Sequence, residues 1–372
     1  MTSFSLKDHL FNEEKVAYLS DLLAGGIPGF DGAAFRVAVM SQMPDLELKE
    51  RIAHIADVMG RMLHGNFEKA AAQIRACLPP PLDPTLGDDD FGDFIIAPFG
   101  RFVEERGLDH YETSMSLLRE ITMRFSTEGS VRPFINRNPE RSLRLFRQWA
   151  TDANYHVRRL VSEGTRPTLP WSPRIVLGVA DPIPLLDVLH ADPTRYVTRS
   201  VANHLNDVSK IDRVLTLLTL ERWRDQGRQE PDELAWMSRH ALRTLVKRGD
   251  PSAMAFLGYS PEPAVTASLV DLTSIVTPGE ALEFAVELSA SAREAVMVDY
   301  TIEFVKMGGG TSPKVFKLKK AELAEGQTTT LEKRHRLRAD ATTYTLYPGT
   351  HRLTVTVNGR PMATGTFELV ID

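Results

Sequence analysis

The chain has 372 residues, of which 42% are hydrophobic and 25% are charged. The length predicts two domains, and the composition is that of an ordinary soluble protein. No apolar run approaches the ~18 residues that span a bilayer, and the first residues lack the apolar core of a signal peptide. Cys77 is the single cysteine, which excludes a disulfide framework and a cysteine metal cluster. We therefore expect a cytoplasmic protein without membrane contact.

The net charge of −5 conceals an uneven distribution of charge along the chain. Residues 1–100 carry 15 Asp or Glu against 8 Lys or Arg, whereas residues 131–174 carry nine arginines against three acids. Residues 306–338 carry nine Lys or Arg against three Glu. Basic segments of this kind can bind phosphates although the whole chain is acidic. The alternative is that both are simply solvated arginine-rich faces.

The first 258 residues have the apolar periodicity of helices. Apolar residues recur three and four apart in five segments: 48–63, 110–125, 138–151, 194–209 and 232–247. Proline-rich or glycine-rich breakers separate the segments at 79–90, 165–184 and 259–264. The pattern predicts a helical domain over residues 1–260.

An internal repeat of 40 residues runs through this helical part. Arg119, Arg159, Arg199 and Arg239 share one phase of it, and Asp152 and Asp192 precede two of the helices at equal distance. A period near 40 with paired helices is typical of HEAT-like repeats, which stack into a curved solenoid with a concave face. The alternative is coincidence among arginine-rich helices.

After residue 264 the apolar period changes from helical spacing to two. Alternation is clear over 282–288, 298–304 and 351–357, and the last of these runs into an Asn358-Gly359 hairpin turn. About seven short strands over residues 261–372 predict an Ig-like β-sandwich. The expected fold is therefore multidomain: an all-α HEAT-like repeat solenoid followed by a small all-β Ig-like sandwich.

Residues 163–171, EGTRPTLPW, follow a helical pattern with an acid, an arginine, two prolines and a tryptophan. Because proline fixes φ and removes a backbone donor, the segment is expected to be a stiff turn outside the helix. Glu163 could then be a reactive carboxylate, or it could pair with Arg159 or Arg166 on a loop. Trp171 could present an aromatic face, or it could fill the core as tryptophan commonly does.

The segment NYHVRRLVSEGTRPTLPWSPR (154–174) resembles the signature of AlkC-type DNA alkylation-repair glycosylases, which are relatives of the AlkD HEAT-like glycosylases. TEGSVRPFI (127–135) is similar to the other acidic motif of that family, and SVANHLNDVSK (200–210) to the helix that follows. KVFKLKK (314–320) and YPGTHRLTVTVNG (347–359) resemble the Ig-like domain of one AlkC subgroup. The resemblance covers most of the chain from about residue 45.

The resemblance implies a glycosylase that removes cationic alkylated bases from duplex DNA without full base flipping. Lys247, Lys319 and Lys320 give no sign of a Schiff-base lysine in an apolar pocket, so we expect a monofunctional enzyme without strand cleavage. Glu163 and Glu128 are the carboxylates that would stabilise an oxocarbenium-like sugar and accept a proton from water. Trp171 would offer its ring to a cation, a contact worth ~1–2 kcal/mol when desolvated. The substrate would be N3-methyladenine, with N3-methylcytosine and N1-methyladenine as further candidates.

The expected partner is double-stranded DNA that carries alkylated bases, bound by a monomer. Residues expected to contact this DNA are basic or polar and lie in both domains: Arg158, Arg159, Arg166, Arg199, Asn203, Lys210, Lys314, Lys317 and Arg334. The ten histidines show no metal-ligand spacing, so neither a metal nor a cofactor is expected. The alternative function is a non-catalytic HEAT-repeat and Ig scaffold that binds DNA or protein.

Overall fold

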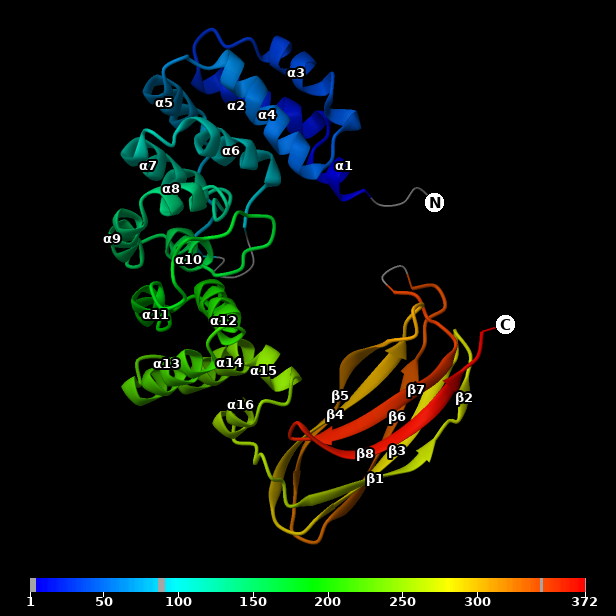
Figure 1. The fold of residues 1–372 in the computed structure, drawn as a ribbon. Coiled ribbons are helices and arrows are strands. Elements are labelled where there is room, and N and C mark those ends of the chain that lie inside the picture. Colours follow the sequence, from blue (N-terminus) through cyan, green and yellow to red (C-terminus); the bar gives the residue numbers. More distant parts are fainter. Residues whose placement is uncertain (1–4, 86–90, 342–343, 372) are drawn as a thin grey trace. The chain divides into compact units, whose positions relative to one another are not determined.

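The structure is a computed structural model that describes residues 5–85, 91–341 and 344–371. It divides into two compact units, Met1–Ala241 and Leu242–Asp372, which are coloured blue to green and green to red in Figure 1. This division lies before the expected domain boundary at residue 260, because the two short helices α15 (Arg243–Lys247) and α16 (Pro251–Phe256) group with the strands. No helix in the described part of the chain is long and apolar enough to cross a membrane.

The first unit is helical throughout. Its elements are α1 (Leu6–Leu10), α2 (Glu13–Gly26), α3 (Gly32–Met40), η1 (Met43–Asp45), α4 (Leu48–Met62), α5 (Phe67–Cys77), η2 (Phe94–Ile96), α6 (Ala97–Arg106), α7 (Tyr111–Thr122), α8 (Arg132–Arg137), α9 (Pro139–Trp149), α10 (Tyr155–Gly164), α11 (Ile183–Leu189), α12 (Arg195–Ser209), α13 (Arg213–Gln226) and α14 (Pro231–Ala241). The five predicted helical segments are present, and the segment 232–247 is split between α14 and α15.

Capping residues fix where these helices begin and end. The Asn66 side chain accepts a hydrogen bond from the Lys69 amide at the start of α5, and Asp212 does the same for the Leu215 amide at the start of α13. Gly227 ends α13 in the left-handed conformation, with φ of 58°. Local sequence therefore sets the start of α5 and both ends of α13.

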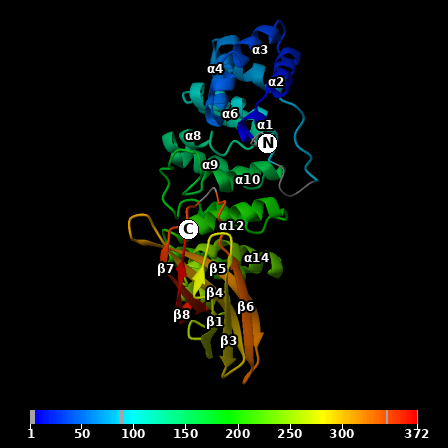
Figure 2. The same cartoon turned by 90° about the vertical axis from the view of Figure 1, so that its right-hand side faces the viewer.

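The helices of the first unit form two rows. Figure 1 shows α5, α7, α9, α11 and α13 along one side and α4, α6, α10, α12 and α14 along the other. In the second row α4 packs on α6, α10 on α12 and α12 on α14, and Figure 2 shows α10, α12 and α14 stacked one below another.

A repeated ion pair links successive helices. Asp152 and Asp192 each accept a hydrogen bond from the amide two residues ahead, at 2.9 Å, just before α10 and α12. Each also receives a guanidinium from an earlier helix: Arg119 Nε lies 2.7 Å from Asp152, and Arg158 Nε lies 2.5 Å from Asp192. The two aspartates therefore repeat in structure as well as in sequence.

The second unit contains two sheets in addition to α15 and α16. The strands are β1 (Val265–Leu272), β2 (Ile275–Val276), β3 (Ala281–Ala290), β4 (Glu294–Val305), β5 (Thr311–Leu323), β6 (Thr328–Arg336), β7 (Gly349–Val357) and β8 (Arg360–Leu369). One sheet has the order β1-β3-β6 and the other β2-β8-β7-β4-β5. Asn358 and Gly359 form the β7–β8 turn with φ of 50° and 79°, as predicted for an Asn-Gly hairpin.

The core of the sandwich is apolar and lies between the inward faces of the two sheets. Leu282 and Val286 from β3 pack with Ile302 from β4 and Leu353 from β7. These are the alternate residues that the period of two predicted to face inward. Tyr300 is also buried, and its hydroxyl is hydrogen-bonded to His335 Nδ1 at 2.7 Å.

Candidate functional site

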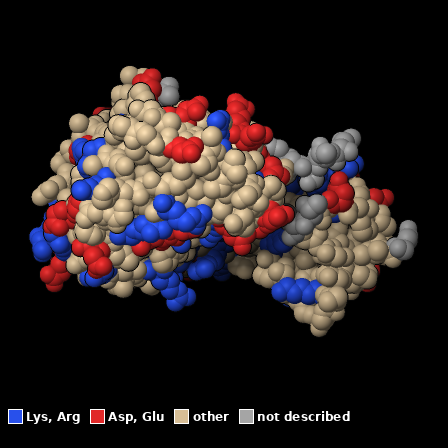
Figure 3. All heavy atoms as spheres, turned by 90° about the horizontal axis from the view of Figure 1, so that it is seen from above, with Lys and Arg blue, Asp and Glu red and all other residues tan. Residues whose placement is uncertain are grey.

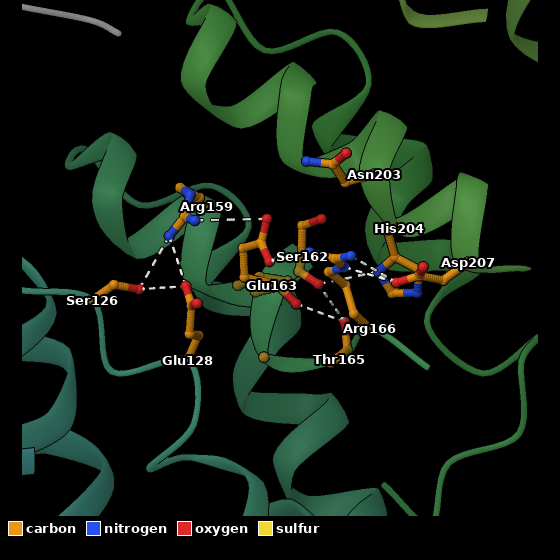
Figure 4. Close-up of polar contacts among 12 residues, drawn as sticks. Ser126, Glu128, Arg159, Ser162, Glu163, Thr165, Arg166, Asn203, His204 and Asp207 are labelled. Carbon is orange, nitrogen blue, oxygen red and sulfur yellow. Dashed lines mark hydrogen bonds and ion pairs between the residues drawn. The ribbon is translucent and has the colours of Figure 1, made fainter. Parts of the chain in front are cut away.

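Glu163 lies in the last turn of α10, and its side chain is only 4% exposed. Helix α10 ends at Gly164, so the stiff turn begins only at Thr165. The prediction that Glu163 lies on this turn is therefore wrong. Figure 4 shows the carboxylate between two guanidinium groups. Glu163 Oε2 accepts from Arg166 Nη1 at 2.9 Å, and Oε1 lies 3.6 Å from Arg159 Nη2.

The two arginines keep this buried carboxylate charged. Burial alone opposes ionisation of Glu163, but first Arg159 and then Arg166 outweigh it and hold its pKa below the ordinary value. Burial likewise opposes the charge on Arg159, and the carboxylates of Glu163 and Glu128 outweigh it and raise the pKa of Arg159. Glu163 is therefore a fixed anion at neutral pH.

Arg159 connects Glu163 to the second predicted carboxylate. Arg159 Nη1 donates to Glu128 Oε2 at 2.9 Å, and Ser126 Oγ donates to the same oxygen at 2.7 Å. The ring of Tyr196 lies against the guanidinium at 4.5 Å from its centroid. The Glu128 side chain is 31% exposed, so of the two carboxylates it is the more accessible. One guanidinium thus bridges a buried anion and an accessible one, as Figure 4 shows.

Trp171 is 69% exposed and has φ of 67°, a conformation uncommon outside glycine. The alternative that its ring fills the core is therefore wrong. The loop that carries it, residues 165–182, is tied by α8 on both sides of Trp171. Arg132, which is fully buried, donates to the carbonyls of Gly164, Arg166 and Pro173 at 3.2, 2.9 and 2.7 Å.

Glu128, Arg159 and Trp171 line one cleft with a volume of about 450 Å³. Its walls are largely aromatic or apolar, and they include Phe91, Phe94, Phe125, Ile52 and Pro170. Glu163 is not among the lining residues and lies behind Arg159. The cleft therefore presents the carboxylates of Glu128 and Glu104 and one indole, while the Glu163 carboxylate is held by ion pairs in the protein interior.

The basic residues predicted for a phosphate track in the first unit have protein partners. Arg158 pairs with Asp192, while Arg166 pairs with Asp207 at 2.8 Å as well as with Glu163. Lys210 is exposed and donates to Asp207 at 2.9 Å. Their contact with DNA stays a prediction, and any phosphate would have to compete with these carboxylates.

Arg199 and Asn203 lie on α12 and are partly buried. Asn203 Oδ1 is hydrogen-bonded to His240 Nε2 at 2.8 Å. Asp207, on the same helix, is buried and holds Arg166, which gives a structural role to a residue for which the sequence indicated none. Figure 3 shows Lys and Arg intermingled with Asp and Glu on the face of the helical unit seen there.

The three basic residues predicted in the sandwich are all exposed. Lys314 and Lys317 lie on β5, which is an edge strand, and Arg334 lies on β6. Lys314 Nζ is 4.3 Å from the ring centroid of Tyr344, and Arg334 Nε is 3.0 Å from Glu283. Because these three side chains are exposed, they can contact a polyanion.

Sequence reasoning missed Lys49, Tyr196 and Arg132, which contact Trp171, Arg159 and the loop respectively. The motif around residues 127–135 contains Arg132, but nothing in its spacing indicates three carbonyl partners more than thirty residues later. In the described ranges no group of three His, Cys, Asp or Glu side chains is placed to hold a metal ion.

Comparison with known proteins places this arrangement in a family. Residues 266–371 match the family model described as the C-terminal Ig-like domain of the uncharacterised protein YhaZ. The chain is 33% identical to the uncharacterized protein YhaZ of Bacillus subtilis (strain 168) over 357 residues, which is 94% of this chain and 95% of that protein.

A solved structure extends the likeness to the whole fold. Pseudomonas fluorescens alkylpurine DNA glycosylase AlkC, bound to DNA containing an abasic site analog, matches with a TM-score of 0.86 and 30% identity over 99% of this chain and 100% of that one. A helical unit followed by an Ig-like sandwich is thus an AlkC-type architecture. The chain belongs to the family of YhaZ and AlkC, in the group with a C-terminal Ig-like domain.

Proposed function

We propose that this protein is a monofunctional DNA glycosylase that hydrolyses the N-glycosidic bond of cationic alkylated bases in duplex DNA. The observation that carries the proposal is the cleft lined by both Glu128 and Trp171, with Glu163 held as a buried anion behind Arg159. N3-methyladenine is the first expected substrate, with N3-methylcytosine and N1-methyladenine as further ones. The similarity to AlkC, which is an alkylpurine DNA glycosylase, supports the same chemistry here.

The reaction requires from the protein chiefly a correctly placed carboxylate. A base methylated at a ring nitrogen is already cationic, so it leaves as a neutral molecule with the electron pair of the N-glycosidic bond. The sugar then develops positive charge, which a preorganised carboxylate stabilises. Water adds its oxygen to C1′ and gives its proton to a carboxylate acting as general base.

The two carboxylates suit different parts of this reaction. Glu128 is accessible from the cleft and accepts hydrogen bonds from Arg159 and Ser126, which orient it. We assign to it the contact with the sugar and the water. Glu163 is buried, so its part is the field of a fixed negative charge and the orientation of Arg159. The exposed ring of Trp171 would meet the cationic base or sugar.

The scaffold is proposed to be a HEAT-like repeat solenoid that binds one side of the duplex. The two rows of helices and the recurring Asp152 and Asp192 ion pairs support the repeat. The Ig-like sandwich is proposed to bind DNA through Lys314, Lys317 and Arg334. From the resemblance to AlkC-type glycosylases we further propose that the base is not fully flipped, unlike in most glycosylases.

The alternative is a HEAT-repeat and Ig scaffold that binds DNA or protein without catalysis. A scaffold has no use for a cleft in which an accessible carboxylate, oriented by a largely buried cation, lies with an exposed indole. The bridge from Glu163 through Arg159 to Glu128 therefore favours the enzyme.

Release of free methylated base from alkylated duplex DNA tests the proposal. We expect single-turnover release by the wild-type protein and a fall of about 10²-fold or more in Glu128→Gln and Glu163→Gln, since each removes a charge that the transition state requires. Asp192→Asn is the matched control, because it removes a buried carboxylate paired to an arginine of the same helix but outside the cleft. DNA binding without release by the wild-type protein would establish the scaffold instead.

A further inference from the structure

A lysine from a distant helix touches the tryptophan of the cleft. Lys49 lies on α4, 122 residues before Trp171, and its Nζ donates to the Trp171 carbonyl oxygen at 3.2 Å. The same ammonium group is 5.6 Å from the centroid of the indole ring. Both residues line the cleft that contains Glu128. One cation therefore contacts both the backbone and the ring of the same residue.

The contact lies between other contacts that hold the loop on either side of Trp171. Just after Trp171 the loop is held by α8, because Arg132 donates to the Pro173 carbonyl at 2.7 Å and Asn136 to the Arg174 carbonyl at 2.8 Å. The tip at Trp171 is exposed and has a left-handed backbone, which a bulky residue adopts only when its surroundings hold it there. A charge-assisted hydrogen bond to the carbonyl of that residue opposes its relaxation to an ordinary conformation.

We propose that Lys49 is a positioning residue that holds Trp171 in its left-handed conformation and so aims the indole into the cleft. The proposal rests on the proposed function, because its consequence for catalysis requires that Trp171 meets the substrate. Lys49 acts on the reaction through Trp171 and not through contact with the reacting atoms. Its own side chain is exposed, so replacing it leaves the core intact.

Lys49→Met removes the ammonium group and keeps the length of the side chain, whereas Lys49→Arg keeps a charged donor. Lys69→Met is the matched control, since it removes one exposed positive charge from the neighbouring helix α5. The first measurement is fluorine NMR of the intact protein labelled with fluorotryptophan, in which the Trp171 resonance among the four tryptophans is assigned by its loss in Trp171→Phe. We expect Lys49→Met to shift or broaden this resonance, and Lys49→Arg and Lys69→Met to leave it in place.

The second measurement is single-turnover release of methylated base from alkylated duplex DNA. Because misplacing a group that contacts the substrate slows the chemical step, we expect a fall of about tenfold in Lys49→Met. We expect Lys49→Arg to recover most of the rate, and Lys69→Met to retain all of it. Binding of undamaged duplex should have the same salt dependence in Lys49→Met as in the wild-type protein.

An unmoved Trp171 resonance in Lys49→Met overturns the proposal, and so does a moved resonance with an unchanged rate. A salt slope that falls by about one with Trp171 in place would identify Lys49 as a phosphate contact instead. The failure of the proposed function looks different: the wild-type protein itself would then release no base, whatever the resonance does.

Discussion

The surroundings of α10 and the Ig-like sandwich use charge in opposite ways. Around α10, the side chains of Glu163, Arg159 and Arg166 are 4%, 16% and 14% exposed and are joined by ion pairs. In the sandwich, the lysines of β5 stand outside a core made of apolar residues such as Leu282 and Leu353. One region brings charge into the protein, and the other keeps it at the surface.

The difference indicates what each region is for. Apolar packing stabilises a fold without further conditions, whereas a buried ion pair loses much of its Coulomb energy to desolvation and is weak evidence for stability. The network of Glu163 differs from the largely buried Arg158–Asp192 pair because its cation is shared with Glu128 of the cleft, and we therefore expect its fixed charge to serve a purpose other than folding. The sandwich, whose charge is exposed, is expected to meet a partner by surface electrostatics alone.

The contrast between the two regions is tested most strongly by replacing Arg159, the residue at the centre of the ion-pair network. Arg159→Met removes the cation that joins Glu163 and Glu128, and leaving a buried charge without that partner should lower the free energy of unfolding by about 3–5 kcal/mol near neutral pH. The loss should shrink at acid pH, because without Arg159 the pKa of Glu163 rises and its protonation removes a buried charge that only Arg166 still faces. Urea unfolding followed by helical ellipticity at both pH values measures this.

Lys317→Met is the comparison from the sandwich for that experiment, since it removes an exposed cation from an edge strand. Equal losses of stability in Arg159→Met and Lys317→Met would remove the distinction between the two regions.

A second test uses His204, which lies fully buried on α12 beside the same network. Its Nδ1 is 3.0 Å from the Ser162 carbonyl, and burial lowers its pKa from 6.5 to about 4, with a smaller contribution from Arg166. Between pH 6.5 and about 4, the His204 imidazole is therefore protonated in the unfolded chain and neutral in the folded protein. Stability should fall as the pH drops from about 6.5 to about 4, by roughly 3 kcal/mol at 1.36 kcal/mol per unit.

The measurement is the free energy of unfolding of wild-type protein and His204→Gln across this pH range. The wild-type curve should be steeper, and the exposed His64, replaced in the same way, should leave the slope as it is. Parallel curves for the wild-type protein and His204→Gln would show that the interior of the helical unit tolerates a charged imidazole.

The smallest expected effects on stability come from the sandwich surface. Lys314→Met and Lys317→Met should change the free energy of unfolding by no more than about 0.5 kcal/mol, because both side chains are exposed. Each should nevertheless lower the salt slope of binding to any duplex by about one if its ammonium group meets a phosphate. Duplex titrations over a range of salt concentrations decide this, and unchanged slopes in both variants would remove the sandwich from the DNA-binding surface.

Local sequence was sufficient for most of the secondary structure. Apolar spacing located helices such as α4, α7 and α12, and Asn358-Gly359 located the hairpin between β7 and β8. These features depend on residues that are close in sequence, through capping, turn geometry and the periodicity of one buried face. The residue types of the site were visible as well, because Glu128, Glu163 and Trp171 stand in motifs that resemble a known family.

The depth and partners of those residues were decided only by tertiary structure. Glu163 was expected on a turn and lies inside α10, whereas Trp171 lies at the surface although a tryptophan is most often buried. Burial depends on which helix or loop covers a position, and those elements come from parts of the chain far away. Lys49, 122 residues from Trp171, is the clearest case.

Arg158 and Arg159 show most simply what the sequence alone cannot predict. The 40-residue repeat put Arg159 in phase with Arg119, yet it is Arg158 that reaches Asp192 as Arg119 reaches Asp152, while Arg159 joins Glu128 and Glu163. Two adjacent arginines are chemically identical in the sequence. On a helix they point about 100° apart, so they meet different neighbours. The sequence determined that both are arginines on one helix, and the packing of that helix decided which one supports the fold and which one reaches the cleft.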